Sequence, residues 1–149
     1  MIYYAQPSIN YDEIKAVNRI LKSKTLTQGK ETEKFEKNFS KITKAKYSIS
    51  FNSCTSALIA ACASLNVKYN DEVWTTPNTF VASSNSAILN GAKIKFIDID
   101  PKTFNMSVDY LERELKKSKK SKLPKVVISV HFAGLINNQK KNLGTIKKI

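Results

Sequence analysis

The sequence predicts an α/β protein with a mostly parallel sheet and flanking helices. From residue 46 onward, strand-like runs alternate with helix-like runs, the order expected for strands joined by crossover helices. Residues 125–130 are almost continuously apolar, as in a strand that a parallel sheet buries on both faces. Before residue 46 the apolar residues recur at helical spacing instead. We therefore expect a helical segment over residues 1–45 and the sheet domain over residues 46–134.

Two helices are predicted ahead of the sheet. Asn10, followed three residues later by Glu13, has the form of a capping box, and apolar residues recur at helical spacing after it, at Ile14, Val17 and Leu21. A second helix is predicted after Gly29, because the same spacing relates Phe35, Phe39 and Ile42.

The alternating part of the chain supplies the remaining elements. Strands are expected at residues 47–51, 72–76, 93–99 and 125–130, from their alternating or continuous apolar patterns. Helices are expected at residues 56–65 and 80–89. A third helix is expected to begin after Ser107 as its N-cap and to carry Leu111 and Leu115. Together these elements predict a doubly wound sheet.

Composition narrows the classes of protein that fit. No stretch approaches the roughly 20 consecutive apolar residues of a membrane-spanning helix, and the N-terminus lacks the pattern of a signal peptide, so we expect a cytoplasmic protein.

Cys54 and Cys62 fall within one predicted helix, too far apart along it to bond to each other and without metal-ligand spacing. We expect both to be reduced and packed as small hydrophobes, with no metal site.

The net charge of +13 is unevenly distributed. Residues 116–149 hold ten lysines and no acid, and nearly all the basic residues of the chain are lysines rather than arginines. The run at residues 116–125 is expected to be a solvated helix end and loop, and we expect neither a nucleic acid nor a membrane as partner. A standalone nucleotide- or nucleic-acid-binding module remains an alternative, and its affinity would depend on salt.

The carboxyl ends of the predicted strands are where a parallel sheet binds ligands. The first of these ends leads through hydroxyl-bearing residues into a helix, and the helix start together with the Thr55 and Ser56 hydroxyls could hold a phosphate. Serine and threonine at a helix start are also ordinary N-caps. At the second end, Phe80 could stack on a planar ring or be a core residue. His131 at the third end has no evident triad partners.

Five short segments carry a more specific signal. They are residues 23–30 (S-K-T-L-T-Q-G-K), 52–58 (N-S-C-T-S-A-L), 75–83 (T-T-P-N-T-F-V-A-S), 96–100 (F-I-D-I-D) and 130–134 (V-H-F-A-G). In this order and spacing they resemble the sugar nucleotide aminotransferases of the DegT/DnrJ/StrS group. The resemblance extends from Tyr4 to about residue 138, but it corresponds to only the first third or so of a family member.

The resemblance implies the N-terminal portion of an aspartate aminotransferase-like large domain, of pyridoxal phosphate (PLP) fold type I. It implies that Thr55 and Ser56 hold the phosphate of pyridoxal 5'-phosphate, and that Phe80 stacks on the pyridine ring of the cofactor. It also implies a nucleotide-sugar site made by Tyr4, Lys24, Thr25, Leu26, Thr27 and Cys54, with Cys54 contributing its backbone.

The activity implied by the resemblance is transfer of an amino group from glutamate to a UDP-linked 4-keto-6-deoxy sugar. Such enzymes are homodimers of nucleotide-sugar and surface-glycan biosynthesis, for example that of pseudaminic acid. A PLP-dependent sugar dehydratase on the same fold stays open, because the position that decides between the two lies outside these residues.

The chain also departs from the family pattern. The family's Schiff-base lysine, and the aspartate that pairs with the pyridine nitrogen, would follow residue 149, so no catalytic residue is assigned and we expect no activity from the chain alone. Residues 135–149 form an atypical lysine-rich end, which predicts a truncation or a frameshift.

Overall fold

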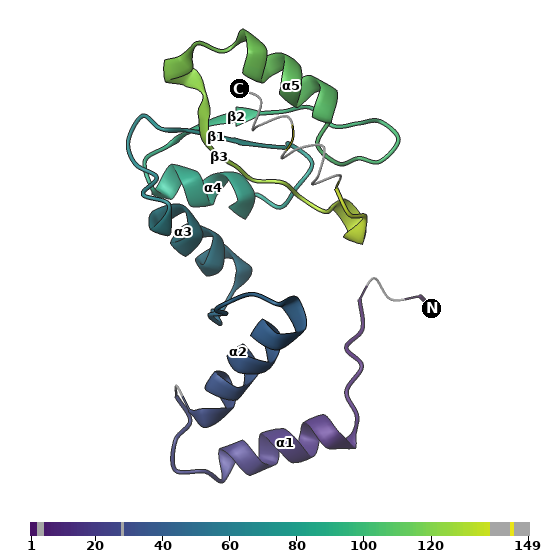
Figure 1. Ribbon diagram of the computed structural model, residues 1–149. Helices are drawn as coiled ribbons and strands as arrows, with labels where there is room; N and C mark the ends of the chain where they lie inside the picture. Colours follow the sequence, from purple (N-terminus) through teal and green to yellow (C-terminus); the bar gives the residue numbers. More distant parts are fainter. Residues whose placement is uncertain (3–4, 28, 138–143, 145–149) are drawn as a thin grey trace. The chain divides into compact units, whose positions relative to one another are not determined.

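The computed structural model describes residues 1–2, 5–27, 29–137 and 144 of the chain. The chain forms two compact units, Met1–Ser50 and Phe51–Ile149. The first unit is helical, whereas the second contains a sheet with helices packed on it (Figure 1).

The first unit consists of α1 (Tyr11–Leu21) and α2 (Lys30–Thr43). The predicted capping box is confirmed: the Asn10 side chain accepts the Asp12 N–H at 2.8 Å, and Glu13 accepts the Asn10 N–H at 2.8 Å. Glu36 of α2 accepts both the backbone N–H and the hydroxyl of Ser50, at 2.7 and 2.8 Å. These two hydrogen bonds, the backbone one first, lower the pKa of Glu36 and fasten the end of this unit to its second helix.

The apolar side chains of α1 and α2 lie on the surface. No residue in either helix is buried, and the three apolar residues that identify each helix in the sequence are all exposed. Phe35 and Phe39 pack against each other with ring centroids 5.9 Å apart. The helices of this unit therefore bury no core of their own among the described residues.

The second unit is built on three parallel strands, β1 (Glu72–Thr75), β2 (Lys93–Phe96) and β3 (Pro124–Val127). Their order in the sheet is β2-β1-β3, with Val73 opposite Ile94 on one side and opposite Val126 on the other. This arrangement confirms the predicted α/β class with a parallel sheet. The helices are α3 (Cys54–Ser64), α4 (Ala82–Leu89) and α5 (Val108–Lys117), with 3₁₀ turns η1 (Lys120–Lys122) and η2 (Phe132–Gly134).

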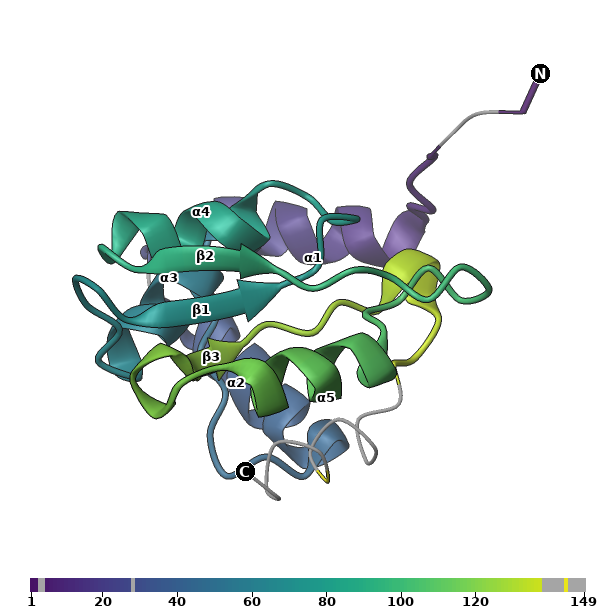
Figure 2. The same cartoon turned by 90° about the horizontal axis from the view of Figure 1, so that it is seen from above.

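Helices cover both faces of this sheet. Figure 2 shows α5 on one face, and α3 and α4 on the other. On the α5 face, Trp74 packs with Ile97, Met106, Leu111 and Leu115. On the opposite face, Val73 packs with Cys62, Val67, Ala87 and Ala92. The predicted N-cap of α5 is confirmed, because the Ser107 hydroxyl accepts the Tyr110 N–H at 3.3 Å.

Several predicted elements differ from the structure. The strand expected at residues 125–130 is the shorter β3, which ends at Val127. The strand expected at residues 47–51 does not form, because among the described residues this extended segment has no neighbouring strand with which to share a ladder. The strand at 93–99 stops at Phe96, and Ile99 instead makes an isolated antiparallel bridge to Met106. The helix at 80–89 begins at Ala82, because residues 77–79 first turn the chain, with the Thr79 N–H bonded to the Pro77 carbonyl at 3.0 Å.

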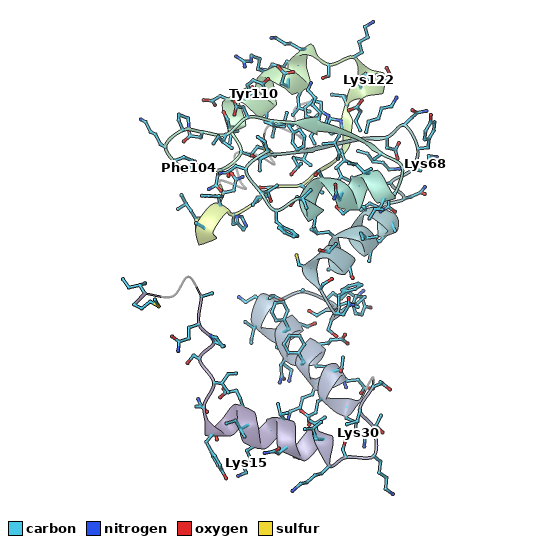
Figure 3. The ribbon with its side chains drawn as sticks, turned by 180° about the vertical axis from the view of Figure 1, so that it is seen from behind. Lys15, Lys30, Lys68, Phe104, Tyr110 and Lys122 are labelled. Carbon is cyan, nitrogen blue, oxygen red and sulfur yellow. The ribbon has the colours of Figure 1, made fainter. Side chains whose placement is uncertain are left out.

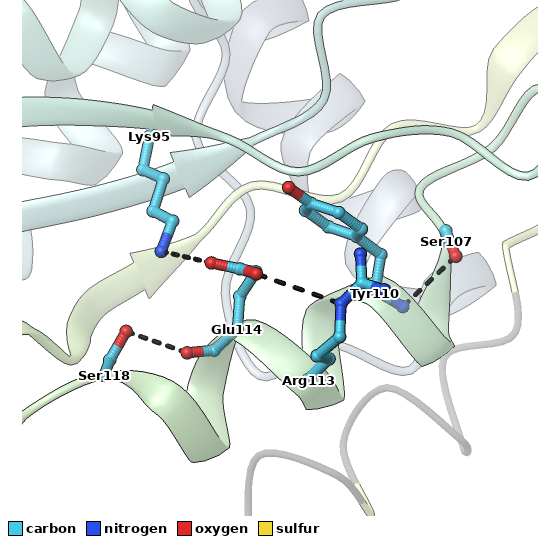
Figure 4. Close-up of polar contacts among 6 residues, drawn as sticks. All are labelled: Lys95, Ser107, Tyr110, Arg113, Glu114 and Ser118. Atoms are coloured by element: carbon cyan, nitrogen blue, oxygen red, sulfur yellow. Dashed lines mark hydrogen bonds and ion pairs between the residues drawn. The ribbon is translucent and has the colours of Figure 1, made fainter.

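An ion pair joins the sheet to α5 (Figure 4). The Lys95 ammonium lies 2.9 Å from the Glu114 carboxylate and 4.4 Å from the centre of the buried Trp74 ring. The hydrogen bond from Lys95 is the main cause that lowers the pKa of Glu114. Glu114 keeps only 17% of its side chain exposed, so solvent screens this pair less than it screens the other ion pairs of α5.

This ion pair predicts that the free energy of unfolding of the sheet unit falls at acid pH. Because the folded pKa of Glu114 lies below its ordinary value of 4.5, its contribution is present above pH 4.5 and is lost as pH falls through the folded value. Glu114→Gln should flatten the loss of stability on acidification below pH 4.5, measured by urea unfolding at a series of pH values. Lys95→Gln should flatten it equally, and the double variant no further. If Glu114→Gln lost as much stability on acidification as the parent chain does, the ion pair would not be the cause.

Candidate cofactor-phosphate site

The first turn of α3 is organised by Ser53. Its backbone is extended, with φ −157° and ψ 156°, and its hydroxyl accepts the Ser56 N–H at 3.1 Å. The Ser53 and Ser56 hydroxyls lie 3.0 Å apart, and the Ser53 carbonyl accepts the first intrahelical bond, from Ala57, at 3.1 Å. Ser53 is therefore the N-cap, which explains why α3 begins two residues before the predicted helix.

Because Ser53 is the N-cap, neither Thr55 nor Ser56 has that role. The N–H groups of Cys54 and Thr55, and the Thr55 hydroxyl, have no hydrogen-bond partner in the part of the chain that the structure describes. The Ser56 N–H, in contrast, is already bonded to Ser53. The donors available for a ligand are therefore the first two helix amides and the Thr55 hydroxyl.

The electrostatics of this helix start favour an anion. The first turn of α3 contains no acidic residue, and Thr55 and Ser56 are half-buried. The partial positive charge at a helix N-terminus is strongest where backbone N–H groups lack partners. Such a set of neutral donors suits an anion, and a phosphate is one anion that it fits.

Two threonines end the central strand. The Thr75 hydroxyl donates to the Ile128 carbonyl at 3.1 Å and so joins β1 to the continuation of β3. The Thr76 hydroxyl oxygen is buried and has no hydrogen-bond partner among the described residues. Sequence reasoning did not single out Thr76, because only the packing around it shows that its hydroxyl is enclosed.

Phe80 lies in the loop between β1 and α4 with 76% of its surface exposed. The alternative that it is a core residue is therefore wrong in this structure. An exposed aromatic ring at the carboxyl side of a parallel strand is available to stack on a planar ligand.

The carboxyl side of β3 is fixed by asparagine side chains. Asn105 accepts the Phe132 N–H at 2.9 Å and donates to the Leu135 carbonyl at 3.1 Å. The Nδ1 atom of His131 accepts the Asn137 N–H, 2.9 Å away. Asn105, which is buried, was not identified from the sequence, because its role depends on a loop 30 residues away.

The residues expected around a nucleotide sugar fall into different units. Lys24, Thr25 and Leu26 line a cavity of about 470 Å³ in the unit Met1–Ser50, together with Arg19 and the first turn of α2. Thr27 is exposed and is not among the lining residues, and Tyr4 lies outside the described residues. Cys54 belongs to the unit Phe51–Ile149, as do Thr55, Ser56 and Phe80.

The two cysteines differ in their surroundings. Cys62 is buried as expected, with its sulfur 3.9 Å from the Ser86 hydroxyl. Cys54 is exposed at the first position of α3, so the expectation that it packs as a small hydrophobe is wrong. Within the described residues there is no group of three or more side chains that could hold a metal ion. None of the described helices is long and apolar enough to cross a membrane.

Comparison with known proteins identifies curated relatives in several organisms. The spore coat polysaccharide biosynthesis protein SpsC of Bacillus subtilis is 37% identical over 131 residues, which are 88% of this chain and 32% of SpsC. A UDP-4-amino-4,6-dideoxy-N-acetyl-beta-L-altrosamine transaminase of Campylobacter jejuni is 40% identical over 99 residues, covering 66% of this chain and 26% of the relative. The chain thus spans about a third of the length of the curated relatives it matches.

Solved structures share the fold. A sugar aminotransferase of Streptococcus pneumoniae, solved in a PLP-form, superposes with a TM-score of 0.88 at 29% identity over 99% of this chain and 36% of that one. Helicobacter pylori PseC, an aminotransferase involved in the biosynthesis of pseudoaminic acid, superposes with a TM-score of 0.86 at 30% identity, over 98% of this chain and 38% of PseC. The DegT/DnrJ/EryC1/StrS aminotransferase family matches residues 7–148, and this chain belongs to that family.

Proposed function

We propose that the start of α3 seats the phosphate of pyridoxal 5'-phosphate in an enzyme that transfers an amino group to a nucleotide sugar. The observation that carries this proposal is the Ser53 cap. Because Ser53 performs the capping, the amides of Cys54 and Thr55 and the Thr55 hydroxyl remain available to phosphate oxygens.

The donor set fits the group. A phosphate dianion accepts several hydrogen bonds, and uncharged donors at a helix start can supply them in a fixed geometry. The Ser56 hydroxyl lies 3.0 Å from that of Ser53 and can turn its proton toward a phosphate while accepting from Ser53. The exposed ring of Phe80 would lie against the pyridine ring and restrict its orientation.

When bound, the cofactor supplies an electron sink that makes amino-group transfer possible at neutral pH. The residues of this chain hold the phosphate, orient the ring and contribute to the sugar pocket. We assign Lys24, Thr25, Leu26 and Thr27, together with Tyr4 and the backbone of Cys54, to the nucleotide sugar. Support comes from the cavity that Lys24, Thr25 and Leu26 line.

The substrate proposed is a UDP-linked 4-keto-6-deoxy sugar, with glutamate as the amino donor. The name of the Campylobacter jejuni relative supports this choice, as do the involvement of PseC in pseudoaminic acid biosynthesis and the polysaccharide biosynthesis role in the name of SpsC. We further propose that the working enzyme is a cytoplasmic homodimer. A GDP-4-keto-6-deoxymannose-3-dehydratase also superposes on the chain, but at 24% identity it indicates the shared fold alone.

Substitutions at the start of α3 separate phosphate binding from helix capping. Thr55→Val removes one free hydroxyl while keeping the shape of the side chain, so it should weaken binding of pyridoxine 5'-phosphate on the order of 10-fold to 100-fold. The same variant should leave the free energy of unfolding nearly unchanged. Binding to the 149-residue chain can be measured by NMR titration, since pyridoxine 5'-phosphate lacks the aldehyde that would react with surface lysines.

Ser53→Ala is the matched control for this experiment. It removes the N-cap and should cost about 1 kcal/mol of stability, measured by urea unfolding. Unphosphorylated pyridoxine should bind neither the parent chain nor Thr55→Val to a measurable extent. If Thr55→Val lost as much stability as Ser53→Ala and kept its affinity for the phosphate ester, the helix start would be purely structural.

We also propose that the 149 residues alone do not complete the reaction. With PLP, glutamate and a UDP-linked 4-keto-6-deoxy sugar, the chain should release 2-oxoglutarate no faster than free PLP does. A full-length relative such as PseC provides the positive control. A rate clearly above that of free PLP would show that the chain contains catalytic groups that its family resemblance does not assign.

A further inference from the structure

Lysines gather where the three strands of the sheet begin. The set comprises Lys68, Lys93, Lys119, Lys120, Lys122 and Lys125, and is named the lysine edge. Polar contacts connect its parts around the first residue of β1, since the Lys122 ammonium lies 3.7 Å from the Glu72 carboxylate. Lys125 lies 3.0 Å from Asp71, and the Lys93 N–H donates to the Asp71 carbonyl at 2.8 Å.

The loop that carries Lys68 belongs to the same edge. Gly91, at φ +85°, lies so close to this loop that a Cβ atom there would approach the Tyr69 nitrogen to 3.2 Å. Lys119 directly precedes the turn η1, and Lys120 is its first residue. The Lys119 carbonyl accepts the Lys122 N–H at 2.7 Å. Figure 3 shows Lys68 and Lys122 at one end of this unit and Phe104 at the other.

The lysine edge is only partly neutralised. Asp71 and Glu72 pair with Lys125 and Lys122, and the hydrogen bond from Lys125 is the main cause that lowers the pKa of Asp71. The other four lysines make no ion pair with the described residues. At the other end of the strands, Asp98 and Asp100 follow β2, with Lys102 beside Asp100. The excess of lysines over acidic residues therefore lies where the strands begin.

The side chains at this edge suit a lipid surface better than a nucleic acid. All six are lysines, which act as point charges, whereas the bidentate fork of arginine is lacking. Arg113 is committed elsewhere, with its guanidinium 4.5 Å from the centre of the Tyr110 ring. Tyr69 is 79% exposed beside Lys68, and an exposed aromatic next to lysines is typical of the membrane interface.

We propose that the lysine edge binds the surface of an anionic lipid bilayer, with Tyr69 at the level of the headgroups. The contact is peripheral and electrostatic, since clusters of four to eight lysines bind anionic headgroups without a spanning segment. The lysine edge lies where the strands begin. The cofactor is proposed to bind at the opposite end, beside the carboxyl ends of the strands. Composition alone led us to expect no membrane partner, because it does not show that these lysines share one edge of the sheet.

The test uses the 149-residue chain and large unilamellar vesicles, one set of phosphatidylcholine and one containing about 30% phosphatidylserine. The parent chain should cosediment with the anionic vesicles and not with the neutral ones. Each lysine near the membrane surface contributes about fivefold to the affinity. A triple variant should therefore bind on the order of 100-fold more weakly; it combines Lys93→Gln, Lys119→Gln and Lys120→Gln. Tyr69→Ser alone should weaken it severalfold, even at high salt.

A matched variant controls for net charge. Lys15→Gln, Lys34→Gln and Lys37→Gln combined remove the same charge from α1 and α2 and should change vesicle binding less than fivefold. Equal losses in the two triple variants, or no binding to anionic vesicles, would overturn the proposal. Tighter binding to a single-stranded oligonucleotide of about 20 residues than to the vesicles, lost in the first triple variant, would identify a nucleic acid instead. None of these measurements requires the cofactor.

Discussion

The pairing of β1 on both of its sides is the interaction on which the sheet unit depends. Successive residues of a strand point to opposite faces, and Val73 and Trp74 use this alternation to enter the two separate cores. Both side chains are fully buried. A strand of four residues thus holds α5 to one face and the α3 and α4 layer to the other.

The contrast between the two units shows which features of the fold are local. The helices of the first unit follow from signals within a few residues, namely the capping box at Asn10 and the spacing of Phe35 and Phe39. A parallel strand, in contrast, requires a neighbour that is distant in sequence. The segment at residues 47–51 has the alternation of a strand but no partner among the described residues, so its pattern alone could not decide its structure.

The same distinction applies to the candidate site. The sequence predicted that a helix start after the first strand-like segment could receive a phosphate, and the structure places free amides there. It could not show which of Ser53, Thr55 and Ser56 is the cap, because all three have hydroxyls and the choice depends on where the helix begins. Asn105 and Thr76 were missed for another reason, since their burial results from contacts between segments far apart in the chain.

Trp74 has a consequence for how this protein can be followed in solution. It is the only tryptophan of the chain, its ring is fully buried between β1 and α5, and its indole N–H has no partner among the described residues. The emission of an indole depends on the water and the charges around it, and here the ammonium of Lys95 lies 4.4 Å from the ring centre. The tryptophan emission, excited selectively over that of the tyrosines, therefore reports on a single place, the contact between the sheet and α5.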